Sequence, residues 1–140
     1  MEVKWSKGKE DLIDAVKIRE EVFVKEQNVP IEIEMDAFDD MAYHIVMYEN
    51  GKPIAVGRLV EKEKYFLIGR VAVLKDYRGK NYGKAIMKNI LEKANELGAK
   101  EVRLHAQLTA KKFYEKLRFE PYGKIFDEAG IAHICMKKYL

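Results

Sequence analysis

The chain has 140 residues, of which 48% are hydrophobic and 35% are charged, and its formal net charge is +3. These values are typical of one ordered domain with its own hydrophobic core, and they exclude an intrinsically disordered chain. The single cysteine, Cys135, excludes an internal disulfide and the zinc-ribbon and iron–sulfur frameworks, which need several cysteines. His133 and Cys135 share one strand face, but no further ligand stands at a suitable spacing, so we expect no metal.

The first half of the chain predicts a strand, a helix and an antiparallel meander. Val3 and Trp5 alternate as in a short strand, and residues 9–25 carry apolar side chains at helical spacing. Residues 28–40 predict a loop or a short helix. Three strands follow, the first two joined by a strong hairpin signal at Asn50-Gly51; we place them at residues 43–48, 54–60 and 65–74.

In the second half, the apolar residues first take helical spacing, and predicted strands and helices then alternate. Residues 82–97 predict an amphipathic helix that ends at Gly98. The remaining elements are a strand at 102–106, a helix at 109–117 and two strands at 119–122 and 131–136. The strand–helix–strand unit requires a crossover, so its two strands should be parallel neighbours in an otherwise antiparallel sheet. No linker divides the chain, and we expect one mixed α+β domain over residues 1–140.

Charge is distributed unevenly in two segments. Residues 26–40 contain six carboxylates and no Lys or Arg, whereas residues 75–84 contain four basic residues and one aspartate. The first segment could attract a cation and the second an anion. Each could equally be an ordinary solvated loop.

The second of these segments has the physical properties of a phosphate-binding loop. It leads from a strand into a helix, where backbone N–H groups lack helical partners and the macrodipole adds positive charge. Gly79 and Gly83 allow a ligand to approach the backbone, and Arg78, Lys80 and Lys84 add formal charge. The loop has neither a Walker ending nor the dinucleotide fingerprint. Taken alone it could be a plain turn.

Residues 68–85 resemble motif A of the GNAT superfamily of N-acetyltransferases, in which a strand is followed by Arg/Gln-x-x-Gly-x-Gly/Ala and a helix. The motif's middle glycine is Asn81 here, and asparagine tolerates left-handed backbone better than most residues. Residues 105–122 resemble motif B, with Arg118 in place of its glycine. Residues 19–30 and 127–133 are similar to the ElaA/YjcF-type branch. The resemblance implies a GNAT acyl-CoA acyltransferase fold, with a mostly antiparallel sheet, a central splayed pair of parallel strands, and flanking helices.

The resemblance also implies acetyl-CoA as co-substrate. Backbone groups of Val71 and Val73 would bind the pantetheine arm, and N–H groups from Gly79 to Lys84 would bind the diphosphate. Tyr114 matches the tyrosine that protonates the departing thiolate, although it could also be a tyrosine packed on a helix face. The full set of implied cofactor residues is Val71, Ala72, Val73, Arg78, Gly79, Lys80, Asn81, Tyr82, Gly83, Lys84, Gln107 and Tyr114.

The implied reaction moves an acetyl group to a primary amine of a small-molecule or peptide acceptor by direct attack. The amine must lose a proton, and the candidates for this base are Glu34, Asp36, His44, His105 and His133. His105 and Glu34 join Tyr114 as candidate catalytic residues, and Glu34, Asp36, His44 and His133 are candidate acceptor-binding residues. The alternative is a non-catalytic acyl-CoA-binding or regulatory module.

Partners and location are predicted from the same composition. Short apolar runs and a polar N-terminal segment predict neither a membrane span nor a secretory signal, and one cysteine fits a reducing, cytoplasmic compartment. A small nucleic-acid binder using residues 75–84 ranks last, because no aromatic–basic pattern of a known reader module accompanies them. The superfamily resemblance adds a homodimer as an expectation.

Overall fold

The computed structural model describes all residues from Met1 to Leu140. A seven-stranded mixed sheet runs in the order β1-β2-β3-β4-β5-β7-β6. The strands are β1 (Glu2–Lys7), β2 (Tyr43–Glu49), β3 (Lys52–Glu61), β4 (Phe66–Val73), β5 (Glu101–Gln107), β6 (Glu120–Glu128) and β7 (Ile131–Tyr139). The helical elements are α1 (Ile13–Arg19), η1 (Glu20–Glu26), α2 (Ile31–Glu34), η2 (Ala37–Asp40), η3 (Lys75–Tyr77), α3 (Tyr82–Glu96), η4 (Leu108–Ala110) and α4 (Lys111–Lys116).

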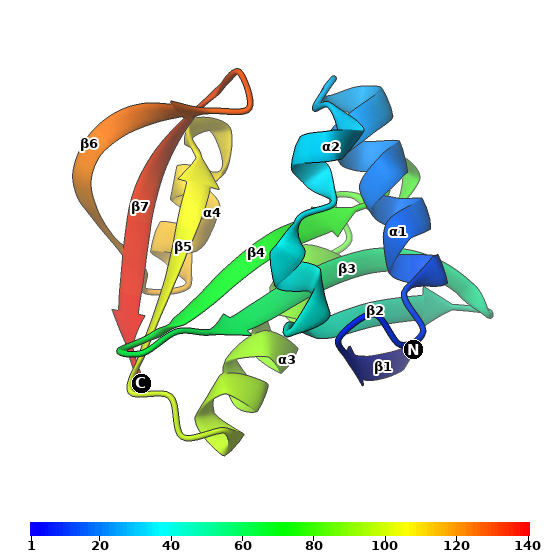
Figure 1. The fold of residues 1–140 in the computed structure, drawn as a ribbon, viewed down its shortest axis with the longest axis horizontal. Helices are drawn as coiled ribbons and strands as arrows, with labels where there is room; N and C mark the ends of the chain where they lie inside the picture. The colour runs from blue at the N-terminus through cyan, green and yellow to red at the C-terminus, as the bar shows by residue number, and fades with distance from the viewer.

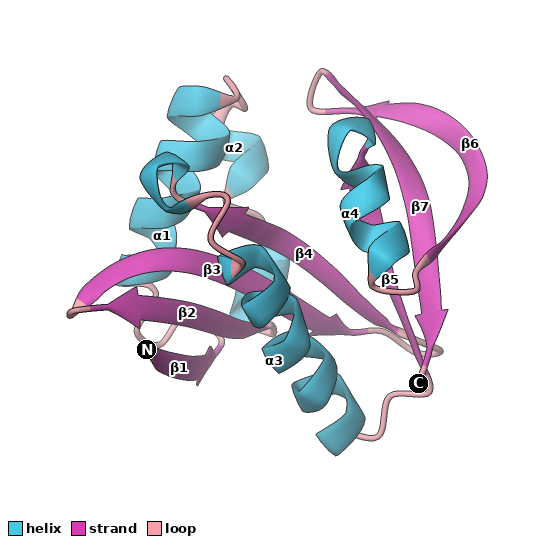
Figure 2. Ribbon diagram, turned by 180° about the vertical axis from the view of Figure 1, so that it is seen from behind, coloured by secondary structure: helices cyan, strands magenta, loops and turns pink.

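Helices cover both faces of the sheet. Figure 2 shows α3 and α4 in front of the strands and α1 and α2 behind them. On the α3 face, Ile86 and Ile90 are fully buried among residues of β2 to β5, and on the other face Ile18 of α1 packs into a smaller cluster. The α3 helix lies directly on the backbone of β3, because a Cβ atom at Gly57 would come within 2.6 Å of the Ile90 side chain. No helix of this fold combines the length and the apolar character needed to span a bilayer.

The first helix differs from its prediction at both ends. It begins at Ile13 instead of residue 9, because the chain before it turns with Gly8 at φ +70° and Asp11 at φ +56°. Beyond Arg19 it continues as one π-helical segment, η1. Because π-helical turns are rare and are frequently found at functional sites, the residues of η1 are candidates for a place in the site.

The central strands pair in parallel and then separate. β4 and β5 are in register at only three positions, Phe66↔Val102, Leu67↔Arg103 and Ile68↔Leu104. Beyond Ile68 the two strands diverge, as Figure 1 shows for the green β4 and the yellow β5. The predicted fold class is confirmed, including the splayed parallel pair.

A β-bulge interrupts β4 where the strands separate. Val56 of β3 pairs with Ala72 and Arg58 pairs with Gly69, so β4 has two residues, Arg70 and Val71, opposite one residue of β3. Arg70 lies at φ +54°, which is a strained conformation for a residue with a side chain. The bulge lets Arg70 project from the α1–α2 face while Val71 packs with the α3-side core.

The last two strands are longer than predicted. β6 is an edge strand exposed along most of its length, and its pairing with β7 is interrupted between Tyr122 and Phe126, near Gly123 at φ +76°. An edge strand with an interruption carries little alternation of apolar and polar residues. The sequence pattern therefore showed only its first residues.

Candidate functional site

A cavity of about 470 Å³ lies where β4 and β5 diverge. Most of its wall comes from the bulged half of β4, the end of β5, η4 and α4, the segment from η1 to η2, and the turn between β6 and β7, and Arg58 of β3 and Arg78 after β4 complete it. The predicted site residues in this wall are Glu34, Asp36, Val71, Ala72, Val73, Arg78, His105, Gln107, Tyr114 and His133. Residues 79–84 and His44 are outside it.

The edge of β4 that faces the cavity has free backbone positions. The N–H of Leu74 donates to the carbonyl oxygen of Ile54 on β3, so Val73 turns its backbone groups to the opposite side. Val71, two residues earlier, shares this orientation. No strand pairs with this edge beyond Ile68, and the carbonyl of Val73 instead accepts a hydrogen bond from Nε of Arg78 at 2.9 Å.

The loop before α3 has the left-handed backbone that the motif requires. Gly79 lies at φ +77°, and Asn81, the N-cap residue of α3, lies at φ +67°, ψ +15°. Asparagine, which tolerates left-handed backbone, thus occupies the position of the motif's middle glycine. No side chain caps the helix and no acidic residue lies in its first turn, so its N–H groups remain available to an anion.

Arg78 is committed to another part of the chain. Its two terminal nitrogens bind the two carboxylate oxygens of Glu26, both at 2.7 Å. The hydrogen bond from Arg78 lowers the pKa of Glu26 below its ordinary value. This pair ties the end of η1 to the loop after β4. Glu26 therefore offsets the formal charge that Arg78 was expected to add to an anion site, and the part of Arg78 in cofactor binding stays a prediction.

Gln107 at the end of β5 makes a similar connection. Its side-chain amide donates to Oε1 of Gln27 at 2.8 Å, and both residues lie in the cavity wall. The end of η1 is thus joined to both diverging strands. Glu26 joins it to the loop after β4, and Gln27 joins it to β5.

Tyr114 of α4 lies in the cavity wall next to the open edge of β4. Its ring makes edge contacts with Phe113 and Phe119 at centroid distances of 5.0 and 5.9 Å. Burial raises the pKa of its phenol to about 12. Tyr114 therefore stays protonated over the physiological range and can act as a proton donor.

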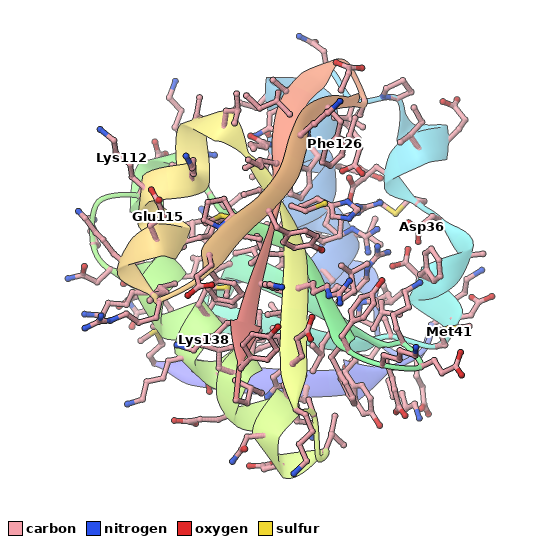
Figure 3. The ribbon with its side chains drawn as sticks, turned by 90° about the vertical axis from the view of Figure 1, so that its left-hand side faces the viewer. Asp36, Met41, Lys112, Glu115, Phe126 and Lys138 are labelled. Carbon is pink, nitrogen blue, oxygen red and sulfur yellow. The ribbon has the colours of Figure 1, made fainter.

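His105, Glu128 and His133 form a cluster on the other side of the cavity. Nδ1 of His105 donates to Oε1 of Glu128 at 2.9 Å, and Nε2 of His133 lies 3.7 Å from Oε2 of the same carboxylate. Nδ1 of His133 donates to the carbonyl of Ile131 at 2.7 Å. Phe126 on β6 (Figure 3) stacks on His133 and meets His105 edge-on.

Glu128 was missed as a site residue, although it lies in the segment 127–133 that carries the resemblance. The hydrogen bond from His105 lowers its pKa, while partial burial opposes the change. The carboxylate is therefore ionised at neutral pH and fixes the His105 ring. No set of three or more His, Cys, Asp or Glu side chains is placed to hold a metal ion.

A network of six charged side chains supports another part of the wall, where Glu34, Asp36, Arg58 and Arg70 line the cavity. Each of its three carboxylates binds two guanidinium groups at distances between 2.7 and 3.0 Å. The pairs are Arg19 and Arg70 on Glu34, Arg58 and Arg70 on Asp36, and Arg19 and Arg58 on Asp39. The arginines come from α1, β3 and β4, all outside the acidic segment.

This network corrects the prediction that Glu34 and Asp36 attract a cationic acceptor. The cations that they bind are arginines of the same chain, and Glu34 is only 3% exposed. Burial raises the pKa of Glu34, and Arg70 and Arg19 oppose the rise. Both guanidinium groups bind the same oxygen of Glu34, Oε2, and stabilise its charged form, so the carboxylate is a poor base for an amine proton.

His44 also lies apart from the other candidates. It is 1% exposed on β2, and its Nε2 donates to the backbone carbonyl of Asp39 at 3.1 Å. Burial lowers its pKa. The structure therefore brings His105 and His133 together and leaves His44 in the interior.

Known proteins share this arrangement of elements. The Acetyltransferase (GNAT) domain family matches residues 8–140. The uncharacterized N-acetyltransferase YjcF of Bacillus subtilis (strain 168) is 42% identical over 139 residues, which cover 99% of each chain. The crystal structure of Escherichia coli ElaA has a TM-score of 0.87 at 28% identity and covers 99% of both chains. An acyl-CoA N-acyltransferase from Pseudomonas aeruginosa has a TM-score of 0.88 at 27% identity, with 98% of both chains covered. The chain belongs to the GNAT acetyltransferase domain family, in the branch that contains YjcF and ElaA.

Proposed function

We propose that the protein transfers an acetyl group from acetyl-CoA to a primary amine by direct attack within a ternary complex. The observation that carries this proposal is the cavity itself, which brings an open strand edge, a protonated tyrosine and a carboxylate-bound histidine to one place. Bound acetyl-CoA would supply a thioester, which is an activated acetyl donor. The family supports acyl-CoA-dependent acyl transfer. The same fold occurs in an aminoglycoside 6'-N-acetyltransferase complexed with coenzyme A, at 10% identity and a TM-score of 0.73.

The residues present fit the co-substrate. Backbone groups of Val71 and Val73 lie on an unpaired strand edge, where amides of an extended ligand can bind as an added strand. The uncapped N–H groups between Gly79 and Lys84 suit a diphosphate. Ala72 and Gln107 complete the wall beside them.

His105 is the proposed base, with Glu128 as its positioning residue. Because Nδ1 of His105 donates to Glu128, the neutral ring carries its free lone pair on Nε2. This nitrogen takes the proton that the amine loses during attack. The Glu128 carboxylate stabilises the imidazolium that results, as in other base–orienter pairs.

Tyr114 is the proposed acid for the leaving sulfur. An ordinary thiol has a pKa of about 8.5, below that of Tyr114, so proton donation in water would be uphill. Burial raises the pKa of a thiol as it raises the pKa of the phenol. The difference between the two pKa values is therefore smaller inside the cavity than between a free thiol and Tyr114.

We expect Tyr114→Phe to lower kcat by about 100-fold, the lower range for loss of a general acid, with the Kd of acetyl-CoA changed less than about threefold. Release of CoA thiol measures the rate and calorimetry measures the affinity. Tyr65→Phe, which alters a tyrosine outside the cavity wall, is the matched control. A Tyr114→Phe rate equal to wild type would exclude the acid role.

We expect Gly83→Val to weaken binding of CoA by at least about 100-fold, because a branched side chain in the first turn of α3 would obstruct the N–H groups that hold the diphosphate. The helix itself should persist, since valine has a better helix propensity than glycine. A Cβ at this position contacts only the Phe113 ring, at 3.4 Å. Lys88→Val on the exposed side of the same helix is the control. Unchanged affinity in Gly83→Val would contradict the loop assignment.

Titration of acetyl-CoA followed by a panel of amines tests the whole proposal. We expect saturable binding and amine-dependent release of CoA. Binding without release under any amine would favour the non-catalytic module, and no binding to well-folded protein would remove the proposal altogether.

A further inference from the structure

The two sides of the cavity carry different charges, and together they define an acceptor class within the proposed function, on which this inference rests. One side presents Glu128 with its two histidines, and the other presents Arg70. Figure 3 labels one residue near each side: Phe126 on β6, and Asp36 on the segment after α2.

One nitrogen of the Arg70 guanidinium group has no hydrogen-bond partner. Nε binds Oε2 of Glu34 at 2.9 Å, and Nη2 binds Oδ2 of Asp36 at 3.0 Å and the carbonyl of Glu34 at 3.1 Å. These bonds use one side of the planar group, and Nη1 has no partner in the protein. The side chain is 20% exposed and lies in the cavity wall, so this nitrogen can bind a ligand.

Arg58 provides a second observation of the same kind. It is 5% exposed and lies in the same wall, yet its Nε has no hydrogen-bond partner. A buried donor without a partner is costly, and such donors usually bond to water or a ligand. The arginine side of the cavity therefore has two donors without partners, Nη1 of Arg70 in the wall and the buried Nε of Arg58, while each of its three carboxylates already binds two arginines.

The backbone supports a functional role for Arg70. Its positive φ places it among strained residues that persist where the surrounding structure holds them, often at ligand sites. The bulge that requires this φ also directs the side chain toward the acceptor side of the cavity.

Glu128 offers the complementary charge. It is the one carboxylate in the cavity wall that binds no arginine directly, and Arg70 is near enough to contribute to its lowered pKa. An ammonium group would be attracted to Glu128 and would there meet the proposed base, His105.

Apolar side chains of the segment from η1 to η2 also line the cavity. Phe23 and Val29 lie in the wall, and Ile33 and Phe38 are 50% and 39% exposed at its rim. Exposed apolar side chains beside a cavity are typical of ligand-binding surfaces.

We propose that the acceptor is a free α-amino acid with an apolar side chain. Its amine faces Glu128 and His105, its carboxylate binds Nη1 of Arg70, and its side chain packs on Ile33 and Phe38. A polyamine fits poorly, because its second cation would lie against the arginine network, where each carboxylate already binds two arginines.

The experiment compares three amines that share one apolar group. L-leucine has the carboxylate, while L-leucinamide and 3-methylbutylamine lack it and have amines that are respectively less and more basic than that of leucine. We expect kcat/KM for leucine, measured by CoA release at saturating acetyl-CoA, to exceed both others by at least about 10-fold, as for loss of a charged hydrogen bond. Spermidine should be poorer than all three.

Arg70→Lys tests the residue. Lysine keeps the positive charge for Glu34 but cannot also reach the acceptor, so the leucine preference should fall below about threefold. Arg103→Lys, outside the cavity wall, should keep the wild-type preference. An unchanged preference in Arg70→Lys would overturn the assignment of the carboxylate to Arg70.

The remaining outcomes separate this inference from the proposed function. Equal or better use of leucinamide, 3-methylbutylamine or spermidine would overturn the amino acid proposal and leave acetyl transfer intact. Binding of acetyl-CoA without CoA release from any of the four amines would count against both.

Discussion

Replacing Arg19 with methionine should destabilise the protein by about 3–5 kcal/mol, the range found when one partner of a buried ion pair is removed. Arg19 is fully buried, and its three nitrogens bind the side chains of Glu34 and Asp39 and the carbonyl of Glu34. Without it, three buried or half-buried carboxylates would share two guanidinium groups. The excess negative charge would remain in the interior.

Urea denaturation measures this effect as a lower midpoint at unchanged m value. Arg103→Met is the control, because Arg103 is more exposed and pairs with Glu101 on the same strand, and its loss should cost less than about 1 kcal/mol. A loss below about 1 kcal/mol in Arg19→Met would mean that the network does not stabilise the segment from η1 to η2.

The difference in unfolding free energy between the wild type and Arg19→Met should depend on pH. Burial alone would raise the pKa of Asp39, but hydrogen bonds from Arg19 and Arg58 lower it below its ordinary value. A carboxyl with a lowered folded pKa stabilises the protein above its unfolded pKa of about 4, and this contribution is lost as the pH falls through the folded value. The wild type and Arg19→Met should therefore converge in stability below about pH 4.

Replacing Glu128 with glutamine should lower kcat/KM for the amine by about 100-fold to 10,000-fold, the range for general base catalysis, with little change in affinity for acetyl-CoA. Glutamine can still accept the proton of Nδ1 of His105 but cannot stabilise the imidazolium. Asp127→Asn, which alters the neighbouring carboxylate that bonds the turn at Gly130, is the matched control.

A double variant tests whether Glu128 acts through His105 or independently of it. If Glu128 acts through His105, then His105→Ala combined with Glu128→Gln should be no slower than His105→Ala alone within about threefold. Additive losses would show that the carboxylate acts independently of the histidine.

Much of the fold could be predicted from periodicity, because the core elements are either amphipathic helices or apolar strands. The change of period after residue 74 predicted the crossover and hence the parallel pair. The left-handed position at Asn81 could be predicted because few residue types tolerate it. The start of the first helix could not, since Gly8 is held by a backbone hydrogen bond to Ala42 and lies against Asp40, both distant in the sequence.

The site was harder to predict, because its charges are paired across long separations. The acidic segment at 26–40 looks like a free anionic surface when only neighbouring residues are considered. Its partners are Arg19, Arg58 and Arg70, which the sheet brings together. Glu128 was missed because it lies on an edge strand whose pattern carries no signal, and only its hydrogen bond to His105 distinguishes it.

The short contact between β4 and β5 divides the sheet into two leaves. Arg70 and its network belong to the first leaf, and His105, Glu128 and His133 belong to the second. In the function we propose, the first leaf selects the incoming molecule and the second removes its proton, and only three paired positions join the two. On that proposal, a substitution on the first leaf should change which amine is used and leave proton removal on the second leaf unchanged.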